Sequence, residues 1–251
     1  PSNYSGCTFT ALDLSQAIYL TSIQNYAFYQ CQGLTGPLTL PDGLISIGQQ
    51  AFEGCSGLTG DLLLPDSLTS LGIHAFNGCS GLNGSLRLPD NAAFTKIPDY
   101  AFYKCMFTGT LTIPSSVTSI GASAFRLDSA AVGFTGELRI PDSVTSIQTA
   151  AFLNQKGFSS LTLSAALSSI PESAFKYTGI SGTLILSEGI SSIGNGAFRG
   201  TGLKTVYLPS SVTLGGTGVF DECSLLTAIV CTSKEQYSTL YSSLSSSGKG
   251  K

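Results

Sequence analysis

The residue with the most obvious catalytic potential is His74, the only histidine of the 251-residue chain. A histidine-based triad needs a nucleophile and an orienting carboxylate beside the ring, but no G-x-S-x-G or C-x-x-C motif is present. His74 precedes an Ala-Phe pair, and similar pairs elsewhere are preceded by Gln50, Tyr100, Ser123, Ala150, Ser173 and Gly196. A position that accepts such different residues is typical of a solvated surface, so we expect no enzymatic activity.

Four aspartates follow a proline at one repeated position, namely Asp42, Asp66, Asp90 and Asp142. A row of carboxylates about 5 Å apart could hold Ca²⁺, which takes several oxygen ligands. The favoured interpretation is a Pro-Asp turn in which each carboxylate accepts nearby backbone N–H groups. The spacing also fits the paired carboxylates of glycoside hydrolases, but any solenoid carrying Asp would meet that test. We therefore expect no metal and no cofactor.

The cysteines follow a regular spacing. Of seven, Cys31, Cys55, Cys79 and Cys105 are 24, 24 and 26 residues apart. This spacing favours a ladder of small buried thiols, while disulfides between adjacent turns are the alternative. A zinc site, which needs closely grouped His and Cys, is not indicated.

The composition excludes two classes of partner. Charged residues are only 11% of the chain and the formal net charge is −3, whereas nucleic acid is bound mainly through clustered Lys and Arg. No run of 18 apolar residues occurs, so we expect no membrane insertion by this segment.

The elements that must position these residues come from an internal repeat. Phenylalanine marks each copy at positions 28, 52, 76, 102, 125, 152, 175, 198 and 220, in steps of 22 to 27 residues. Such a period with aliphatic spacing predicts a solenoid of nine to ten turns. The step of 26 contains PDNAAFTKI, which is two residues longer than PDSLTSL in the preceding copy.

Each repeat contains two extended pieces. The first is an L-x-L pair such as Leu62/Leu64, and the second has apolar residues three apart, as in LTSLG. A turn carrying Ala-Phe follows, for which we expect about one turn of helix. Alternation turns the two aliphatic residues of L-x-L inward and the residue between them outward.

The outward positions of the first piece are the predicted binding residues, because they vary where the inward positions are uniform. They are Asp13, Thr39, Leu63, Arg87, Thr112, Arg139, Thr162, Ile185 and Tyr207. Arg87, Arg139 and Tyr207 are types favoured as binding anchors. A solvated face without a partner is the equally weighted alternative. A second, less favoured surface is an aromatic edge comprising Tyr26, Tyr29, Tyr100, Tyr103, Met106 and Phe107.

The pattern C-x2-L-x3-L-x-L-P-x2-L-x2-I-G-x2-A-F-x-G-C, over about residues 9–231, resembles the BspA-like leucine-rich repeats of the Treponema pallidum class. Departures are Ser15, Ser164 and Ser187 in place of Pro, and no Cys in the copies of Phe125 to Phe198. The resemblance implies a right-handed leucine-rich-repeat solenoid with little helix. It also implies an extracellular or cell-surface domain whose concave sheet adheres to a host matrix or cell-surface protein, with a glycan as another ligand. The alternative is a spacer or stalk with no ligand.

The expected domain organisation is a solenoid over residues 1–232, followed by a cap helix and flexible tail over 233–251. Tyr237, Leu240, Tyr241 and Leu244 have helical spacing in this last segment, and a solenoid needs its last apolar turn covered.

Overall fold

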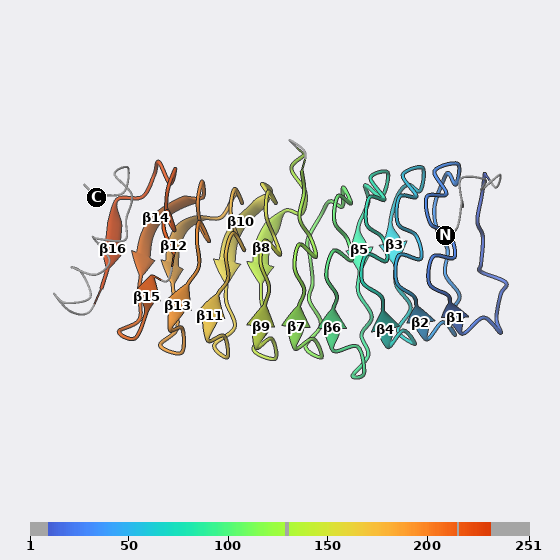
Figure 1. Ribbon diagram of the computed structural model, residues 1–251, viewed down its shortest axis with the longest axis horizontal. Helices are drawn as coiled ribbons and strands as arrows, with labels where there is room; N and C mark the ends of the chain where they lie inside the picture. The colour runs from blue at the N-terminus through green and yellow to red at the C-terminus, as the bar shows by residue number, and fades with distance from the viewer. Residues whose placement is uncertain (1–9, 129–130, 215, 232–251) are drawn as a thin grey trace.

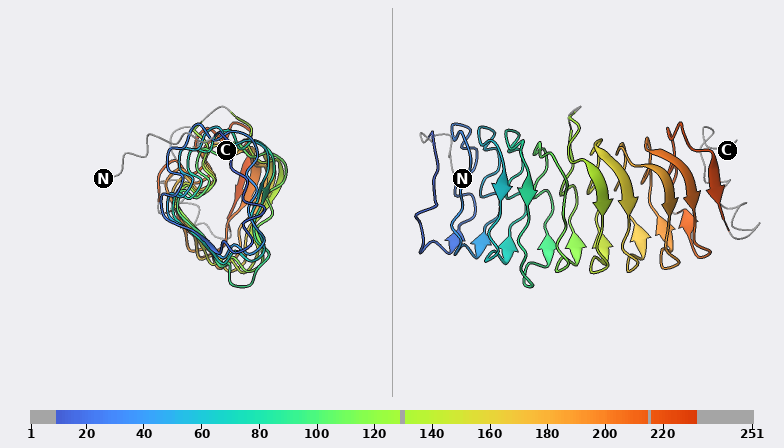
Figure 2. Two further views of the ribbon diagram at one scale, coloured as in Figure 1. Left: turned by 90° about the vertical axis from the view of Figure 1, so that its right-hand side faces the viewer. Right: turned by 180° about the vertical axis from the view of Figure 1, so that it is seen from behind.

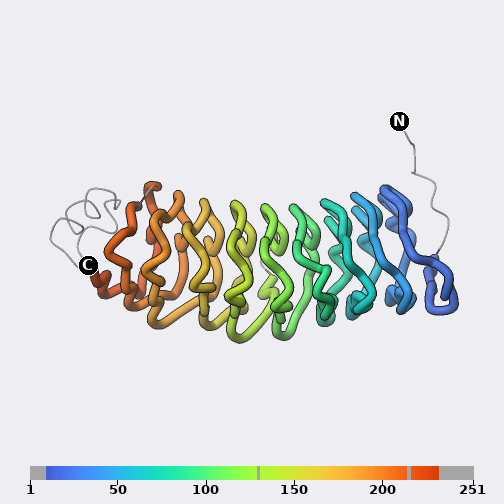
Figure 3. The backbone as a smooth tube through the Cα atoms, turned by 90° about the horizontal axis from the view of Figure 1, so that it is seen from below, coloured from blue at the N-terminus to red at the C-terminus, as the bar shows by residue number. Residues whose placement is uncertain are grey.

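The computed structural model describes residues 10–128, 131–214 and 216–231, which wind into a parallel β-solenoid. Figure 1 shows the turns stacked side by side in an elongated and nearly straight array, and Figure 3 shows the same from below. No helix occurs in the described ranges. The predicted cap helix and tail, residues 233–251, lie outside them.

Each turn contributes one very short strand to the lower row of Figure 1, here called the second-strand row. In the described residues this row has nine members of two residues each: β1 (Ser22–Ile23), β2 (Ser46–Ile47), β4 (Ser70–Leu71), β6 (Lys96–Ile97), β7 (Ser119–Ile120), β9 (Ser146–Ile147), β11 (Ser169–Ile170), β13 (Ser192–Ile193) and β15 (Thr213–Leu214). They correspond to the predicted second extended piece.

The predicted L-x-L piece forms the first-strand row: β3 (Leu62–Leu63), β5 (Leu86–Arg87), β8 (Gly136–Arg139), β10 (Phe158–Thr162), β12 (Ser181–Ile185), β14 (Gly202–Tyr207) and β16 (Ala228–Val230). Every pairing between strands is parallel, and partners are one repeat apart, as in Leu62 opposite Leu86. The sequence period therefore sets the register directly.

An aromatic stack runs the length of the core. Consecutive rings from Phe28 to Phe220 have centroids 5.0 to 5.9 Å apart and are nearly parallel, with interplanar angles of 4 to 13°. The small neighbours Ala51, Ala75 and Ala101 are completely buried. Burying each ring stabilises the fold by roughly 1.5–3 kcal/mol, so the stack explains why one Phe recurs in each turn. Figure 2 shows the turns superimposed along the stacking axis.

A second, shorter stack was not anticipated from the sequence. Phe107, Phe134 and Phe158 stack with centroids 5.9 and 6.2 Å apart, at a position that holds Leu34, Leu58 and Leu82 in earlier turns. Phe107 is only 1% exposed. Its assignment to a surface aromatic edge was therefore wrong, because its side chain fills the core.

The sequence predicted about one turn of helix at Ala-Phe, and this prediction was wrong. The Ala-Phe turn is instead part of a hydrogen-bond ladder between turns of the solenoid. The amide of Phe28 donates to the carbonyl of Ala51 at 2.7 Å, and that of Phe52 to Ala75 at 2.8 Å. The residue preceding Ala is left-handed in turn after turn, with φ of 58° at His74, 58° at Ala150 and 55° at Gly196. This backbone points amides along the stack, so they bond to the next turn.

Both rows are divided into separate hydrogen-bonded sheets. In the second-strand row, the sheet β1-β2-β4 ends and β6-β7-β9 begins where the chain is two residues longer, at residues 89–97. In the first-strand row, β3-β5 is separated from β8-β10 by residues 111–113, which belong to no strand. One break in the second-strand row therefore coincides with the longer copy, and a further break, between β9 and β11, occurs without added residues.

Candidate functional site

The first-strand face is defined by the outward side chains of the L-x-L pieces, and the structure exposes all nine predicted residues. Leu63, for example, is 54% exposed between the fully buried Leu62 and Leu64. The solenoid is nearly straight in Figures 1 and 3, whereas the resemblance implied a concave sheet. We therefore name this surface by its strands.

The strand register brings most of these residues together in neighbouring pairs. Leu63 lies opposite Arg87, and Arg139 opposite Thr162. Ile185 lies opposite Tyr207, which in turn lies opposite Val230. Asp13 forms an isolated parallel bridge with Thr39.

Thr112 stands apart from the other predicted residues, because it lies in the interruption between β5 and β8. A hollow of about 490 Å³ opens there, lined by Leu86, Arg87 and Thr112 among others. The interruption divides the first-strand face into an N-terminal and a C-terminal part.

Arg87, one of the three expected anchors, is engaged within the protein. Its Nη2 donates to both carboxylate oxygens of Asp66, at 2.6 and 2.5 Å, and its Nη1 donates to the carbonyl of Leu64 at 3.2 Å. The hydrogen bonds from Arg87 to the Asp66 carboxylate, and then the one from the amide of Asp90, lower the pKa of that carboxyl. A ligand that binds the Arg87 guanidinium would have to compete with Asp66 for it.

Arg139 differs, because it forms no ion pair with any residue that the structure describes. Its neighbour Thr162 donates to Glu137 Oε1 at 2.6 Å. Arg139 is the cation of this face whose charge is least compensated within the described chain.

The last three strands of the face, β12, β14 and β16, carry exposed apolar residues. Ile185 is 71% exposed, Tyr207 43% and Val230 41%. Val230 was missing from the predicted set, although it lies between Ile229 and Cys231 in the same alternation. These three residues, here called the apolar end, are the most exposed hydrophobic run in register on the solenoid's described strands.

Two of the four repeated aspartates accept hydrogen bonds from backbone amides of the next turn. Oδ1 of Asp66 accepts the amide of Asp90 at 2.9 Å, and Oδ1 of Asp142 accepts that of Ala165 at 3.0 Å. The expected bond to backbone N–H is present at both, but its donor lies one turn further along the chain. In the described ranges no group of three or more His, Cys, Asp or Glu side chains is placed to hold a metal ion.

Among the described residues, the ring partners of His74 include no nucleophile. Its ring stacks on Tyr100 with centroids 4.7 Å apart, and Nδ1 lies 3.0 Å from Asn77 Nδ2 and 4.0 Å from Glu53 Oε2. It is about one-third exposed, so the position is less solvated than the sequence indicated.

The cysteines behave as buried hydrogen-bond donors. The thiols of Cys55, Cys79 and Cys105 donate to the carbonyls of Phe28, Phe52 and Phe76, at 2.9 to 3.1 Å. Burial raises the pKa of Cys79 and Cys105, and the described cysteines form no disulfide. The ladder of buried thiols agrees with the sequence interpretation; Cys7 lies outside the described ranges.

The aromatic edge is held by contacts among its own members. Tyr26 packs against Tyr29, and Tyr100 against Tyr103, in edge-to-face pairs with centroids 5.8 and 5.6 Å apart. Tyr103 also donates to Asp128, and Lys104 Nζ lies 4.9 Å from the Tyr103 ring centroid. These contacts favour edge packing over an open platform for sugars.

Comparison with known proteins agrees with this geometry. The family model described as BspA type leucine rich repeat region matches residues 1–131 and 134–245 in six copies. No curated protein sequence gives a significant match. Within the described ranges, no helix is long and apolar enough to cross a membrane.

Three solved structures are similar. The pneumococcal vaccine antigen PcpA is 17% identical with a TM-score of 0.53, over 94% of this chain and 65% of that chain. A leucine-rich repeat protein from Bacteroides ovatus ATCC 8483 is 22% identical with a TM-score of 0.48, over 76% of this chain and 59% of the other. A leucine rich cell surface protein from Faecalibacterium prausnitzii A2-165 is 24% identical with a TM-score of 0.43, over 92% of this chain and 85% of that chain. The chain thus spans less than two thirds of the first and second of these proteins.

Proposed function

Because the chain belongs to the BspA type leucine-rich repeat family, we propose that it is a non-enzymatic binding domain of a secreted or cell-surface protein. Its ligand in this proposal is another protein, such as a host matrix or cell-surface protein. The first-strand face carries the interaction, and the apolar end provides its centre.

The observation that carries the proposal is the register of Ile185, Tyr207 and Val230. Contiguous exposed apolar side chains are uncommon on soluble monomers and mark interaction sites. Tyrosine is also enriched among the residues that dominate binding energies. The proposal therefore moves the anchor from Arg87 to the C-terminal part of the face, with Tyr207 retained.

The backbone under the apolar end is well suited to binding. β12, β14 and β16 form one parallel sheet, and β12 and β14 are five and six residues long where most strands have two. A preformed surface loses little conformational freedom when it binds. Arg139, on β8 of the same face, supplies a cation that no described residue neutralises.

A spacer or stalk is the second function that a specific observation favours. The solenoid is long and nearly straight (Figure 1), and apart from Leu63 the rest of the first-strand face is polar, with Thr39, Thr112 and Thr162. Such a body holds another domain at a distance without needing a ligand.

A binding screen tests the proposal. The wild-type protein, the triple variant I185S/Y207S/V230S and the control S46A/S169A/S192A, which changes the separate second-strand row, are passed over immobilised matrix and serum proteins in surface plasmon resonance. We expect saturable binding to at least one protein, weakened at least about tenfold in the triple variant and unchanged in the control. Absence of binding across the panel would favour the spacer.

A further inference from the structure

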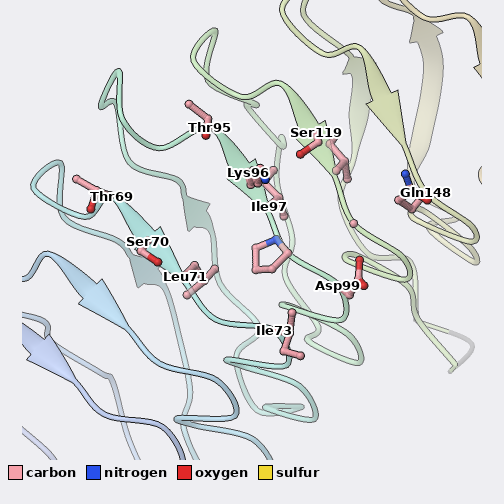
Figure 4. Close-up of a pocket in the computed structure, with 13 residues that line it drawn as sticks. Thr69, Ser70, Leu71, Ile73, Thr95, Lys96, Ile97, Asp99, Ser119 and Gln148 are labelled. Atoms are coloured by element: carbon pink, nitrogen blue, oxygen red, sulfur yellow. The ribbon is translucent and has the colours of Figure 1, made fainter.

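A hollow of about 360 Å³ lies in the second-strand row, on different strands from the first-strand face. Its walls come from β4, β6 and β7 with the residues next to them, and from Gln148 after β9 (Figure 4). It opens where the sheet β1-β2-β4 stops and β6-β7-β9 begins. The two extra residues of the copy at 89–97 thus coincide with both the break in the ladder and the hollow.

The side chain at the centre of this hollow breaks the repeat. The outward position of the second strand is serine or threonine in the other eight described turns: Ser22, Ser46, Ser70, Ser119, Ser146, Ser169, Ser192 and Thr213. In β6 it is Lys96, which is exposed and lies opposite Ser119. Lys96 makes no ion pair with any residue in the described part of the chain.

The other walls supply neutral donors, acceptors and an apolar surface. Hydroxyls come from Ser70, Thr95 and Ser119, and apolar surface comes from Ile73, which is 42% exposed, and from Pro98. Figure 4 shows Lys96 between the flanking serines, with Ile73 below it.

One carboxylate also lines the hollow. Asp99 uses Oδ1 to accept the amide of Ala122 at 2.7 Å. It forms no ion pair with Lys96 or with any other cation of the described residues. As an acceptor it favours a ligand that carries hydroxyl donors.

We propose that the hollow around Lys96 binds a sugar that carries a carboxylate, as a hexuronic or sialic acid does. A single ammonium without a partner fits a single carboxylate, which would form a charge-assisted hydrogen bond with it. The serine and threonine hydroxyls and Asp99 bind the sugar hydroxyls, and Ile73 and Pro98 contact its C–H face. One lysine is too little charge for nucleic acid.

The row of serines extends the site beyond the hollow. Neighbouring turns of a parallel sheet lie about 4.8 Å apart, so hydroxyls follow each other at about that interval within the sheet β1-β2-β4 on one side of Lys96 and along β7 and β9 on the other. An acidic glycan running along the row would gain hydrogen bonds with each turn that it crosses. A longer oligosaccharide should therefore bind more tightly than its monosaccharide.

Calorimetric titration with glucuronic acid, oligogalacturonate, sialyllactose and the neutral sugars lactose and oligogalactan tests this inference. We expect an acidic sugar to bind, its affinity to rise with chain length for the uronates, and the neutral sugars to bind at least about tenfold more weakly. Binding should also weaken with added salt, because an exposed charge pair is screened. Equal affinity for acidic and neutral sugars, or no binding of any acidic sugar, would overturn the proposal.

The variants K96S and K96R make the test specific. K96S installs the residue that the other turns carry, so we expect it to fold normally and to lose at least about tenfold in affinity. K96R should retain binding, and K204S, which removes an exposed lysine from β14, is the matched control. Unchanged affinity in K96S would overturn the proposal. The triple variant of the apolar end should bind the sugar normally, which separates this site from the proposed protein-binding face.

Discussion

Ile185 and Tyr207 lie opposite each other on β12 and β14, and both side chains remain exposed while Leu184 and Val206 beside them are buried. One repeat therefore presents an aliphatic residue and the next an aromatic residue at the same place on a regular sheet. Packing accounts for the buried pair but not for the exposed one. This difference is the basis for assigning a binding role to the outward positions.

The aromatic stack should be the main source of stability. Replacing Phe102 by alanine removes a ring that lies between Phe76 and Phe125 and is 1% exposed. We expect a loss of about 3–5 kcal/mol in the free energy of unfolding, measured by urea denaturation. A loss of unfolding free energy no larger than that caused by Thr112→Ala, a substitution at an exposed residue, would contradict the stabilising role of the stack.

The left-handed position before Ala gives a paired prediction. Ala150 has φ of 58°, and the same position in a later turn is Gly196, with φ of 55°. Because a side chain costs roughly 1 kcal/mol there, Ala150→Gly should be neutral or stabilising, whereas Gly196→Ala should destabilise by about 1 kcal/mol. Chemical denaturation of both variants checks the sign, and the opposite order would show that the strain is absent.

The ion pair between Asp66 and Arg87 should respond to pH in a defined direction. Because the pKa of Asp66 is lowered in the folded protein, its contribution to stability is complete above the ordinary Asp value of 3.8 and is lost as the pH falls through the lowered value. Arg87→Ala should raise the pKa of Asp66, as measured by carboxyl NMR titration. An unchanged titration would mean that the pair does not form in solution.

The buried thiols should be unreactive in the native state. Burial raises the pKa of Cys79 and Cys105, and the thiolate is the reactive form. Among the cysteines that the structure describes, we expect iodoacetamide at pH 8 to modify the half-buried Cys231 first, and Cys79 and Cys105 only after unfolding. Peptide mass spectrometry with and without denaturant measures this order. Rapid native modification of Cys79 would contradict the packing of the ladder.

Much of the fold follows from sequence because one period controls it. A residue and its counterpart one repeat later are neighbours in space, so the alternation of Leu62, Leu63 and Leu64 predicts burial, exposure and register together. The same alternation could have added Val230 to the predicted binding residues. The prediction of a helical turn at Ala-Phe was wrong because the amides there bond to the next turn. Local helix propensity does not reveal such bonds between turns.

The candidate sites were only partly predictable, for a physical reason. Whether Arg87 is available depends on the direction of its long side chain toward Asp66 in the preceding turn, and residue type does not determine that direction. The hollow around Lys96 depends on how a two-residue insertion separates β4 from β6. Both features arise between turns, where rotamers and small shifts of the backbone decide the outcome.

The most direct test of the protein-binding function compares the affinity of Tyr207→Ala with that of Arg87→Ala for the protein partner found in the screen, with melting temperatures measured alongside. The account predicts that Tyr207→Ala weakens binding at least about tenfold, that Arg87→Ala changes it little, and that both variants melt close to the wild type. A loss of affinity confined to Arg87→Ala, or equal affinities in all three proteins, would contradict the assignment of the apolar end as the centre of the interface.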